Sequence, residues 1–584
     1  MIGDALRRRA IELGVEVTYD DVDQVTHDAD EVVVARVVEV LEEDRSRHPA
    51  HIVEPIHLDP ALTVAVAATP TDAELTVEGT SVGVNLGPGG VDLPDGLPVG
   101  CHTLRIEADG HVAECLVVVA PSAMPGFDPV ERSSCLFAPA YSLWEHDEPL
   151  PSFRHLARLA DRMTRFGVDM VATLPLYAAF LDQPFDPSPY SPISRLHWNE
   201  VYLSDAGLPA APLPDLGDDG LGGDVDWREL AARRRRQLLR AALDADDLLV
   251  GELDRFRAAH PDVGSFARFM ASRESGGDLV VERSHVLAQY LADRELSAIG
   301  HNGSASLSLD LPIGSHPEGW ETWAHPQLFA TSMSVGAPPD TFFTEGQNWG
   351  FSPQLPAAIR QSGYELWRQM IARAGRYCDL LRIDHVMAVH RLWWVPEGQS
   401  ADRGVYVRYP HDELLAVIAA EAAVAGVGIV GENLGTVPPE VDAALDAWNV
   451  LGMHEEQFHL DGPDLAEIPA RSVAGVRTHD MAPFAAVVDD PANAETTAAY
   501  RDRLGAATPA DQPLLDAVIT RLGASDAQIV VVDLDDLVDE TRPHNLPGRV
   551  VDGIWRRRLD RPTSETLADD RVVRRLELLG RTPS

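Results

Sequence analysis

The stretch LLRIDHVMAVHRLWW, residues 380–394, is apolar except for a short polar interruption. The apolar run ends in Arg382, Ile383, Asp384 and His385, and it then resumes in apolar and aromatic residues. On a β-strand, residues two apart face the same side, so we expect Arg382 and Asp384 side by side and Ile383 directed into the packing behind them. Such a strand, ending in charged residues, predicts a functional site at its carboxyl end.

Short apolar runs alternate with longer helical patterns on both sides of this stretch. That alternation is typical of βα units around a parallel sheet. Eight such runs predict a (β/α)8 barrel, in which the carboxyl ends of the strands carry the chemistry. The candidate strands cover residues 135–140, 168–176, 306–313, 378–384, 427–433, 454–460, 473–480 and 527–534.

The remaining texture divides the chain into three regions. Residues 1–50 have helical spacing, and residues 51–130 consist of short alternating runs that favour a β-sandwich-like domain. Residues 131–584 form the predicted barrel, with an insertion at about 205–300. The predicted fold class is therefore α/β: a (β/α)8 TIM barrel with inserted helical subdomains and an N-terminal helical plus β-sandwich extension. Within the insertion, the run RRRR at 233–236 is expected to be a solvated helix face.

Charge and composition exclude several classes of function. The 584 residues carry 92 acidic and 48 basic side chains, a formal net charge of −44, which repels nucleic acid and anionic membranes. All of the basic residues are arginine, so a lysine Schiff base and a P-loop lysine are both excluded. The four cysteines form no C-x-x-C pair, and no apolar run is long enough to span a membrane. We expect a cytoplasmic protein with no nucleic-acid or membrane partner.

Three of the predicted strands end in a carboxylate within a polar cluster: Asp384, Glu432 and Asp480. Any one of them could be a helix cap or a turn residue, but three together at strand ends indicate a shared site. Paired carboxylates are what glycoside chemistry needs, one to attack the anomeric carbon and one to act as acid and then base. Arg382 favours the ionised form of Asp384, which suits a nucleophile, whereas Glu432 follows an apolar run that suits a protonated acid.

Seven stretches resemble the 4-alpha-glucanotransferases (amylomaltases, or disproportionating enzymes) of glycoside hydrolase family 77, in the alpha-amylase clan. Both the residues in these stretches and the order of the stretches along the chain are specific to that family. They are SPYSPISRLHWNEVYL (188–203), SVGAPPDTFFTEGQNWG (334–350), LRIDHVMAVHRLWWVPEG (381–398), GVYVRYPHDELL (404–415), GENLGTVPPEV (431–441), THD (478–480) and NLPG followed by WRRRL (545–559).

The resemblance implies that Asp384 is the nucleophile, Glu432 the general acid/base and Asp480 the transition-state stabiliser. It implies α-1,4-glucans (maltooligosaccharides) as both donor and acceptor, with no metal and no organic cofactor. The family commonly has an aspartate where this chain has Asn433. The residues implied to bind substrate are Arg382 and His479 in the cleaved subsite, Tyr190 and Ser191 beside it, and Asp340, Gln347 and Trp349 on the acceptor side.

Other functions remain open at this point. The same chemistry could serve mainly hydrolysis, since loop closure and not the motif sets the ratio of transfer to hydrolysis. In another class, Asp384, His385, Glu432, His479 and Asp480 could be ligands of a divalent metal. A glycan-binding protein without turnover is a third possibility, which the intact carboxylate trio disfavours.

Overall fold

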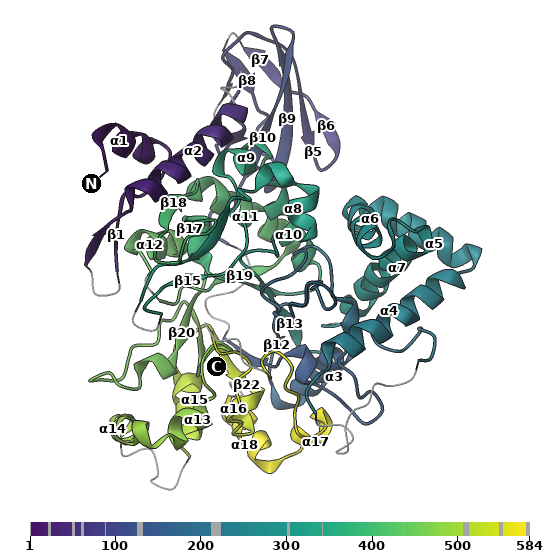
Figure 1. Ribbon diagram of the computed structural model, residues 1–584, viewed down its shortest axis with the longest axis vertical. Helices are drawn as coiled ribbons and strands as arrows, with labels where there is room; N and C mark the ends of the chain where they lie inside the picture. The colour runs from purple at the N-terminus through teal and green to yellow at the C-terminus, as the bar shows by residue number, and fades with distance from the viewer. Residues whose placement is uncertain are drawn as a thin grey trace. The chain divides into compact units, whose positions relative to one another are not determined.

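A computed structural model shows the architecture of the chain (Figure 1). Two compact units are distinguished. The first comprises residues 1–126, 313–376 and 385–450, and the second comprises residues 127–312, 377–384 and 451–584. The residues that the structure describes are 2–21, 25–48, 53–59, 63–87, 89–124, 132–211, 223–300, 304–340, 343–435, 437–505, 513–547 and 553–579.

The second unit contains seven strands of a parallel sheet. Their apolar runs are buried on both faces, as expected for a parallel sheet covered by helices. Phe137 of the first strand is in register with Asp533 of the last, and Asp310 is in register with Arg382. The strands are β11 (Ser133–Phe137), β12 (Met170–Ala172), β13 (Ser306–Leu311), β16 (Leu380–Ile383), β20 (Gly452–Glu455), β21 (Ser472–Gly475) and β22 (Ile529–Asp533).

The strand order identifies the sheet as a barrel. It reads β19-β16-β13-β12-β11-β22-β21-β20, where β19 covers Gly428–Gly431. The last strand along the chain, β22, pairs with the first, β11. Sequence order therefore runs round a circle, as in a (β/α)8 barrel, and the predicted fold class is confirmed.

All eight predicted strands are present, but each ends earlier than expected, β20 and β21 by five residues. The run at 454–460 was predicted to be strand throughout, whereas β20 stops at Glu455 and a 3-10 helix, η6, covers Glu456–His459. β21 stops at Gly475, so Asp480 lies in a loop beyond the strand and not at its last position. In both runs the polar residues after the strand lie outside the sheet, where they make hydrogen bonds or ion pairs.

Four helices form the insertion, and an aspartate caps the amino end of three of them. They are α4 (Trp227–Leu243), α5 (Asp247–Ala259), α6 (Pro261–Ser275) and α7 (Leu279–Leu296). Residues 212–222 of the predicted inserted loop lie outside the described residues.

The prediction of a solvated RRRR face is wrong for half of the run. Arg233 and Arg234 are buried at 2% and 1% exposure, and Asp205 binds both guanidinium groups. A buried arginine needs such a partner, and Asp205 is too far away in sequence for helical periodicity to reveal it.

The other helices of the second unit are α3 (Phe153–Met163), α13 (Phe484–Asp489), α14 (Ala494–Leu504), α15 (Leu514–Ala524), α16 (Leu534–Leu537), α17 (Thr563–Thr566) and α18 (Asp570–Leu579).

The amino-terminal part of the first unit combines helices with two small sheets. A five-stranded sheet of order β3-β10-β9-β5-β6 and a three-stranded sheet of order β4-β8-β7 share an apolar core that includes Leu75, Leu104 and Val117. The elements are α1 (Asp4–Glu12), β1 (Thr18–Asp20), β2 (Thr26–Asp28), α2 (Glu31–Arg47), β3 (Ile56–His57), β4 (Val64–Ala65), β5 (Pro70–Val77), β6 (Thr80–Val82), β7 (Asn85–Gly87), β8 (Gly90–Asp92), β9 (Gly100–Ala108) and β10 (His111–Val119).

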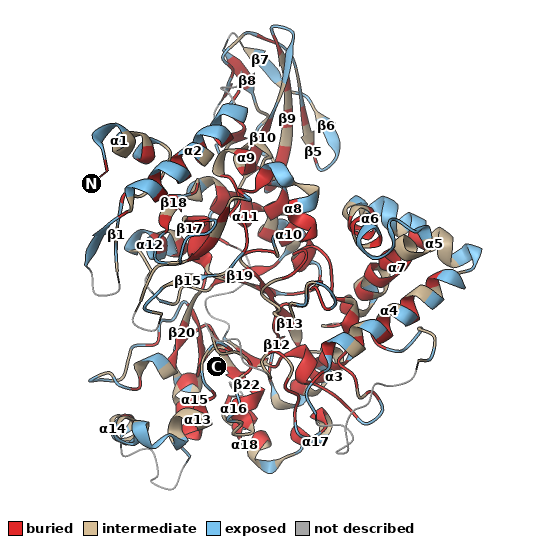
Figure 2. Cartoon of the chain, in the orientation of Figure 1, coloured by how far each residue is buried: buried red, intermediate tan, exposed pale blue. Residues whose placement is uncertain are grey.

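The rest of the first unit contains β19 and a four-stranded antiparallel sheet of order β15-β14-β17-β18. Trp393 and Trp394, in β17, are buried core residues at 1% and 0% exposure, and most of β17 is coloured as buried in Figure 2. The elements are β14 (Met333–Ala337), β15 (Gln347–Asn348), β17 (Arg391–Pro396), β18 (Val405–Arg408), α8 (Trp320–Ala324), α9 (Pro356–Gln361), α10 (Glu365–Gly375), α11 (His411–Ala425) and α12 (Pro439–Ala447).

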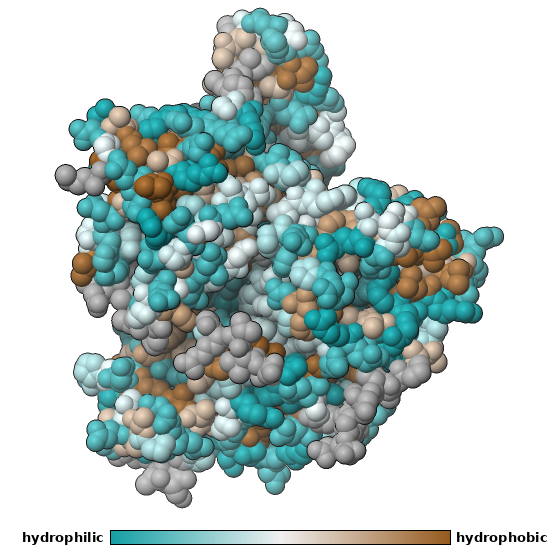
Figure 3. All heavy atoms as spheres, viewed as in Figure 1, coloured by the Kyte–Doolittle hydropathy of each residue, from teal (hydrophilic) through white to brown (hydrophobic). Residues whose placement is uncertain are grey.

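The surface agrees with the composition. Figure 3 shows a face that is mostly hydrophilic, in keeping with the net charge of −44. Among the helices of the described residues, none is long and apolar enough to cross a membrane. The four cysteines are free thiols.

Candidate active site

The polar interruption that opens the sequence analysis forms an ion-pair cluster in the second unit. Arg382 Nη1 donates to Asp310 Oδ1 at 2.7 Å and to Asp310 Oδ2 at 2.9 Å, and it lies 3.0 Å from Asp384 Oδ1. Arg382 and Asp384 thus share a face of the strand, and Ile383 between them is buried at 2% exposure. The Asp384 side chain keeps 19% of its surface exposed, so it is both charge-paired and accessible.

Asp310, at the carboxyl end of β13, is a member of this cluster that sequence reasoning missed. It is 5% exposed, and besides Arg382 it accepts a hydrogen bond of 2.5 Å from Tyr190 Oη. The signal was available, because LDLPI interrupts an apolar run in the same way as RIDH does. Asp310 fixes Arg382 and Tyr190 together, and the cross-strand register of Asp310 with Arg382 explains why these two meet.

Tyr190 brings an aromatic cluster to the same unit. Its ring stacks on His479, with centroids 5.0 Å apart and planes 10° apart. The ring centroid of Trp555 lies 6.0 Å from the centroids of both rings, and sequence reasoning did not assign this residue to the site. Burial lowers the pKa of His479 and raises that of Tyr190 well above its usual value, so both groups are neutral near pH 7. Ser191 follows Tyr190, and its N–H donates to Ser188 O at 3.1 Å.

Asp480 follows His479 and is the more open carboxylate, at 45% side-chain exposure. Asn545 Nδ2 donates to Asp480 Oδ1 at 2.6 Å, and His479 Nε2 lies 3.4 Å from the same oxygen. Asn545 belongs to the NLPG motif but was given no role from the sequence. The second unit therefore brings together five of the predicted site residues, which are Tyr190, Arg382, Asp384, His479 and Asp480.

Glu432 belongs to the first unit, directly after β19. Its Oε2 accepts the His385 N–H at 2.9 Å, and its Oε1 accepts the Leu434 N–H at 2.7 Å. Two main-chain donors therefore fix both carboxylate oxygens. Asn433 is directed to Asp442, with a hydrogen bond of 3.2 Å. The orientation of Glu432 is thus set by the main chain.

His385 links Glu432 to the predicted acceptor residues of the first unit. Its backbone has a φ of 45°, and burial, with a contribution from Arg391, lowers its pKa to about 4. Trp349 meets the His385 ring edge-on at 5.1 Å. Gln347 lies in β15, paired with Ala337.

Asp340 has a local contact in the same unit. Its Oδ1 accepts the Phe343 N–H at 2.6 Å, so it caps a turn of the loop before β15. Within the described residues, no group of three or more His, Cys, Asp or Glu side chains is arranged to hold a metal ion.

Comparisons with known proteins agree on one family. The family model for 4-alpha-glucanotransferase, glycoside hydrolase family 77, matches residues 138–284 and 280–564. A 4-alpha-glucanotransferase of Mycobacterium tuberculosis (strain H37Rv) is 28% identical over 544 residues, covering 78% of this chain and 75% of that protein. One from Haemophilus influenzae is 26% identical over 565 residues, covering 82% and 79%.

The fold has solved relatives. The amylomaltase from Corynebacterium glutamicum superposes with a TM-score of 0.86 and 22% identity, covering 99% of both chains. The amylomaltase from Streptococcus agalactiae, solved in complex with acarbose, has a TM-score of 0.65 and 21% identity, covering 77% of this chain and 98% of that one. Since the family model spans well over half of the sequence, the chain belongs to the 4-alpha-glucanotransferase family, glycoside hydrolase family 77.

Proposed function

We propose that this protein transfers segments of α-1,4-glucan between maltooligosaccharides by a retaining double displacement. The observation that carries the proposal is the cluster of Arg382, Asp384 and Asp310. It provides an ionised, accessible carboxylate at the carboxyl end of a barrel strand, where barrel enzymes hold their catalytic groups. Family membership supplies the substrate class.

In the first step Asp384 attacks the anomeric carbon of the donor while Glu432 protonates the glycosidic oxygen. The bond from the anomeric carbon to that oxygen breaks as the bond to Asp384 forms, and the reducing-end fragment leaves. Arg382 keeps Asp384 ionised until substrate arrives. A retaining route requires the two carboxyl groups to flank the scissile bond roughly 5 Å apart.

In the second step an acceptor sugar replaces the departed fragment. Glu432 removes the proton of its 4-hydroxyl, and the oxygen attacks the anomeric carbon and releases Asp384. Two inversions give net retention. The chemistry uses side chains alone and requires no metal or organic cofactor.

Glu432 must be protonated before the first step and ionised before the second. A donor chain that displaces water and presents its glycosidic oxygen would favour the protonated acid. The main-chain N–H groups of His385 and Leu434 hold the carboxyl group in place.

Substrate binding is assigned to the aromatic and polar groups around these carboxylates. The neutral Tyr190 and His479 rings, held by Asp310 and Trp555, suit a glucose ring in the cleaved subsite, and Ser191 borders it. Asp480 is assigned to the sugar hydroxyls of the distorted ring. Trp349, Gln347 and Asp340 are assigned to the acceptor side, where an indole face suits the apolar face of a sugar.

The test is incubation with maltotriose and separation of the products. We expect a ladder of longer maltooligosaccharides together with glucose. Glucose and maltose alone would show that hydrolysis predominates and would overturn the assignment as a transferase. Acarbose, which binds the Streptococcus agalactiae relative, is expected to inhibit the reaction.

Glu432→Gln tests the acid/base role. We expect a fall of about 10³ in kcat on maltotriose, because the glutamine can neither give nor take the proton. A donor whose leaving group needs no protonation, α-maltotriosyl fluoride, should restore formation of the glycosyl-enzyme. Equal loss on both donors would refute the role.

We also place the protein in the cytoplasm, where free thiols such as its four cysteines stay reduced. Cell fractionation with an activity assay tests this location.

A further inference from the structure

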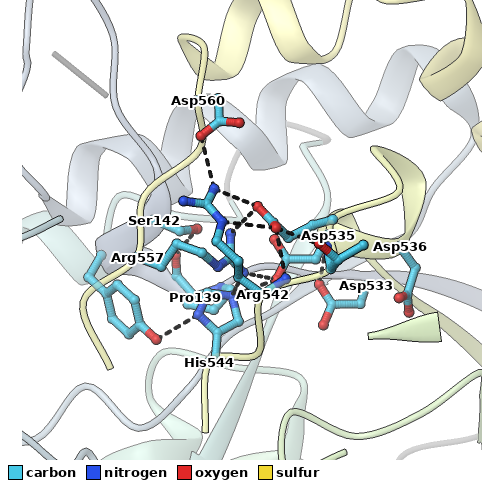
Figure 4. A network of polar contacts seen from close by, with 12 residues as sticks. Pro139, Ser142, Asp533, Asp535, Asp536, Arg542, His544, Arg557 and Asp560 are labelled. Atoms are coloured by element: carbon cyan, nitrogen blue, oxygen red, sulfur yellow. Dashed lines mark hydrogen bonds and ion pairs between the residues drawn. The ribbon is translucent and has the colours of Figure 1, made fainter. Parts of the chain in front are cut away.

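His544 lies at the centre of a buried polar network in the second unit. Its Nδ1 is 2.9 Å from Tyr141 Oη, and its Nε2 is 2.8 Å from Asp535 Oδ2. Arg557 Nη2 donates to the same Asp535 oxygen. All four residues are at most 3% exposed. Figure 4 shows His544, Asp535 and Arg557 grouped together, with Arg542 and Asp560 beside them.

His544 Nε2 faces two charged groups, since Arg557 Nη2 lies 2.8 Å from it and Asp535 Oδ2 lies at the same distance. Burial raises the pKa of Asp535, but its contacts with His544 and Arg557 lower it more, so the net shift is downward and the carboxylate is ionised. Burial lowers the pKa of His544. The ring of His544 is therefore tied at one nitrogen to the Tyr141 hydroxyl and at the other to the ion pair of Asp535 and Arg557.

The main chain of His544 is fixed as well. Its carbonyl accepts the Trp555 N–H at 2.9 Å, and Trp555 in turn packs against the His479 and Tyr190 rings. Before it along the chain, Glu540 accepts from Arg542 Nε at 3.0 Å and lies 3.3 Å from Arg557 Nη1. The loop that leads to residue 545 is thus anchored on its buried side by several ionic contacts.

Asn545 is the next residue, and its contact is with the open carboxylate. Asp480 lies five positions beyond the end of its strand, in a loop, with its side chain 45% exposed. Both of its described polar side-chain contacts, from Asn545 and from His479, go to Oδ1. An Asp480 held through Oδ1 presents Oδ2 to a sugar hydroxyl.

We propose that Asn545 is a positioning residue that sets the orientation of Asp480, and that the network of Tyr141, Asp535, His544 and Arg557 holds Asn545 in place. This inference rests on the proposed role of Asp480 in glucan transfer. Rotation of an exposed aspartate costs little in water, whereas an aspartate held before substrate arrives loses no orientational freedom in the transition state.

The experiment compares Asn545→Ala with wild type in maltotriose disproportionation. We expect kcat to fall about tenfold with KM changed less than threefold, because the carboxylate remains present but loses its orientation. Asn545→Asp should lower kcat more, since it sets a like charge 2.6 Å from the Asp480 oxygen. Asn493→Ala, which removes an amide that donates to Val487 O, is the matched control and should leave both constants unchanged.

A double-mutant cycle separates positioning from a direct contact with substrate. In an Asp480→Asn background, assayed at high enzyme concentration, Asn545→Ala should reduce kcat by less than twofold more. An undiminished tenfold loss in that background, or a rise in KM with kcat unchanged, would overturn the proposal. Absence of any maltooligosaccharide ladder from wild type would instead refute the proposed function.

Tyr141→Phe tests the buried network, because it removes only the hydroxyl that contacts His544 Nδ1. We expect kcat to fall about threefold at constant KM, with the loss disappearing when Asn545 is already alanine. A loss that persists in the Asn545→Ala background would show that the network acts by another route. Unchanged kcat in Tyr141→Phe would remove the network from the proposal.

Discussion

Two strand ends in the second unit carry arginine–carboxylate clusters with different exposure. At β16 and β13, Arg382 joins Asp310 and Asp384, and Asp384 keeps 19% of its side chain exposed. At β22, Arg477 lies 2.9 Å from both Asp533 and Asp536, whose side chains are 4% and 0% exposed. The residue types and the position on a barrel strand match. The exposure of the Asp384 side chain distinguishes this reacting group from the structural carboxylates of the other cluster.

The closed cluster also differs in its charge balance. Asp533, Asp535 and Asp536 are three buried carboxylates served by two arginines, Arg477 and Arg557. Asp535 is held ionised, whereas burial raises the pKa of Asp533 to about 8 and also raises that of Asp536. In the open cluster the balance is two carboxylates to one arginine, and solvent reaches the second carboxylate. Asp533 in the closed cluster is therefore protonated near pH 7, whereas Asp384 in the open cluster is paired with an arginine and reached by solvent.

The strongest test of this comparison is to make the same aspartate-to-asparagine substitution at both strand ends. Asp384→Asn is expected to lower kcat on maltotriose by at least about 10⁴-fold, because an amide cannot form the glycosyl-enzyme. Asp533→Asn should retain activity within about threefold of wild type. Steady-state kinetics with intact-mass detection of a glycosyl-enzyme on wild type check both, and an active Asp384→Asn would end the nucleophile assignment.

A smaller effect is expected at the shared partner of the open cluster. Asp310→Asn weakens two charge-assisted hydrogen bonds, to Arg382 and to Tyr190, so kcat/KM should fall about 10–100-fold. The matched control is Asp205→Asn, since Asp205 also pairs with two groups but lies in the insertion. That control should lower thermal stability and leave kcat/KM within about twofold. Equal kinetic losses in the two variants would show that Asp310 acts through stability alone.

A separate prediction concerns stability and pH at the closed cluster, not catalysis. A folded pKa of about 8 for Asp533, above its ordinary value of 3.8, means that the folded state binds a proton which the unfolded state has released. This stabilisation is complete below about pH 4 and is lost as pH rises through 8, by up to about 1.4 kcal/mol per pH unit. The free energy of unfolding of Asp533→Asn, measured by urea denaturation, should therefore increase relative to that of wild type between pH 5 and pH 8. A constant difference across that range would contradict the buried proton.

The sequence predicted the barrel because its signals are local. Eight apolar runs alternate with helical spacing, and all eight strands appear in order. The pairing of Arg382 with Asp384 also follows from two-residue periodicity alone. The resemblance to a known family added the roles of residues, which periodicity cannot assign.

What could not be predicted depends on partners far away in sequence. Asn545 meets Asp480 across 65 positions, and Arg233 is buried because Asp205 reaches it from a loop. The carboxylate of Glu432 accepts hydrogen bonds from the N–H groups of His385 and Leu434. Every residue except proline carries such a donor, so no sequence motif reveals these contacts. Burial and direction of such contacts are properties of the folded chain.

The register of β11 with β22 has a consequence for how the protein is made. These neighbours stand at opposite ends of the barrel sequence, so β11 emerges from the ribosome long before its partner exists. At about 5–20 residues per second, the roughly 400 intervening residues take on the order of 20–80 s to synthesise. During that time one edge of β11 remains open to unwanted pairing. Truncation before residue 529 would leave that edge exposed permanently, and such nascent chains should depend on chaperones.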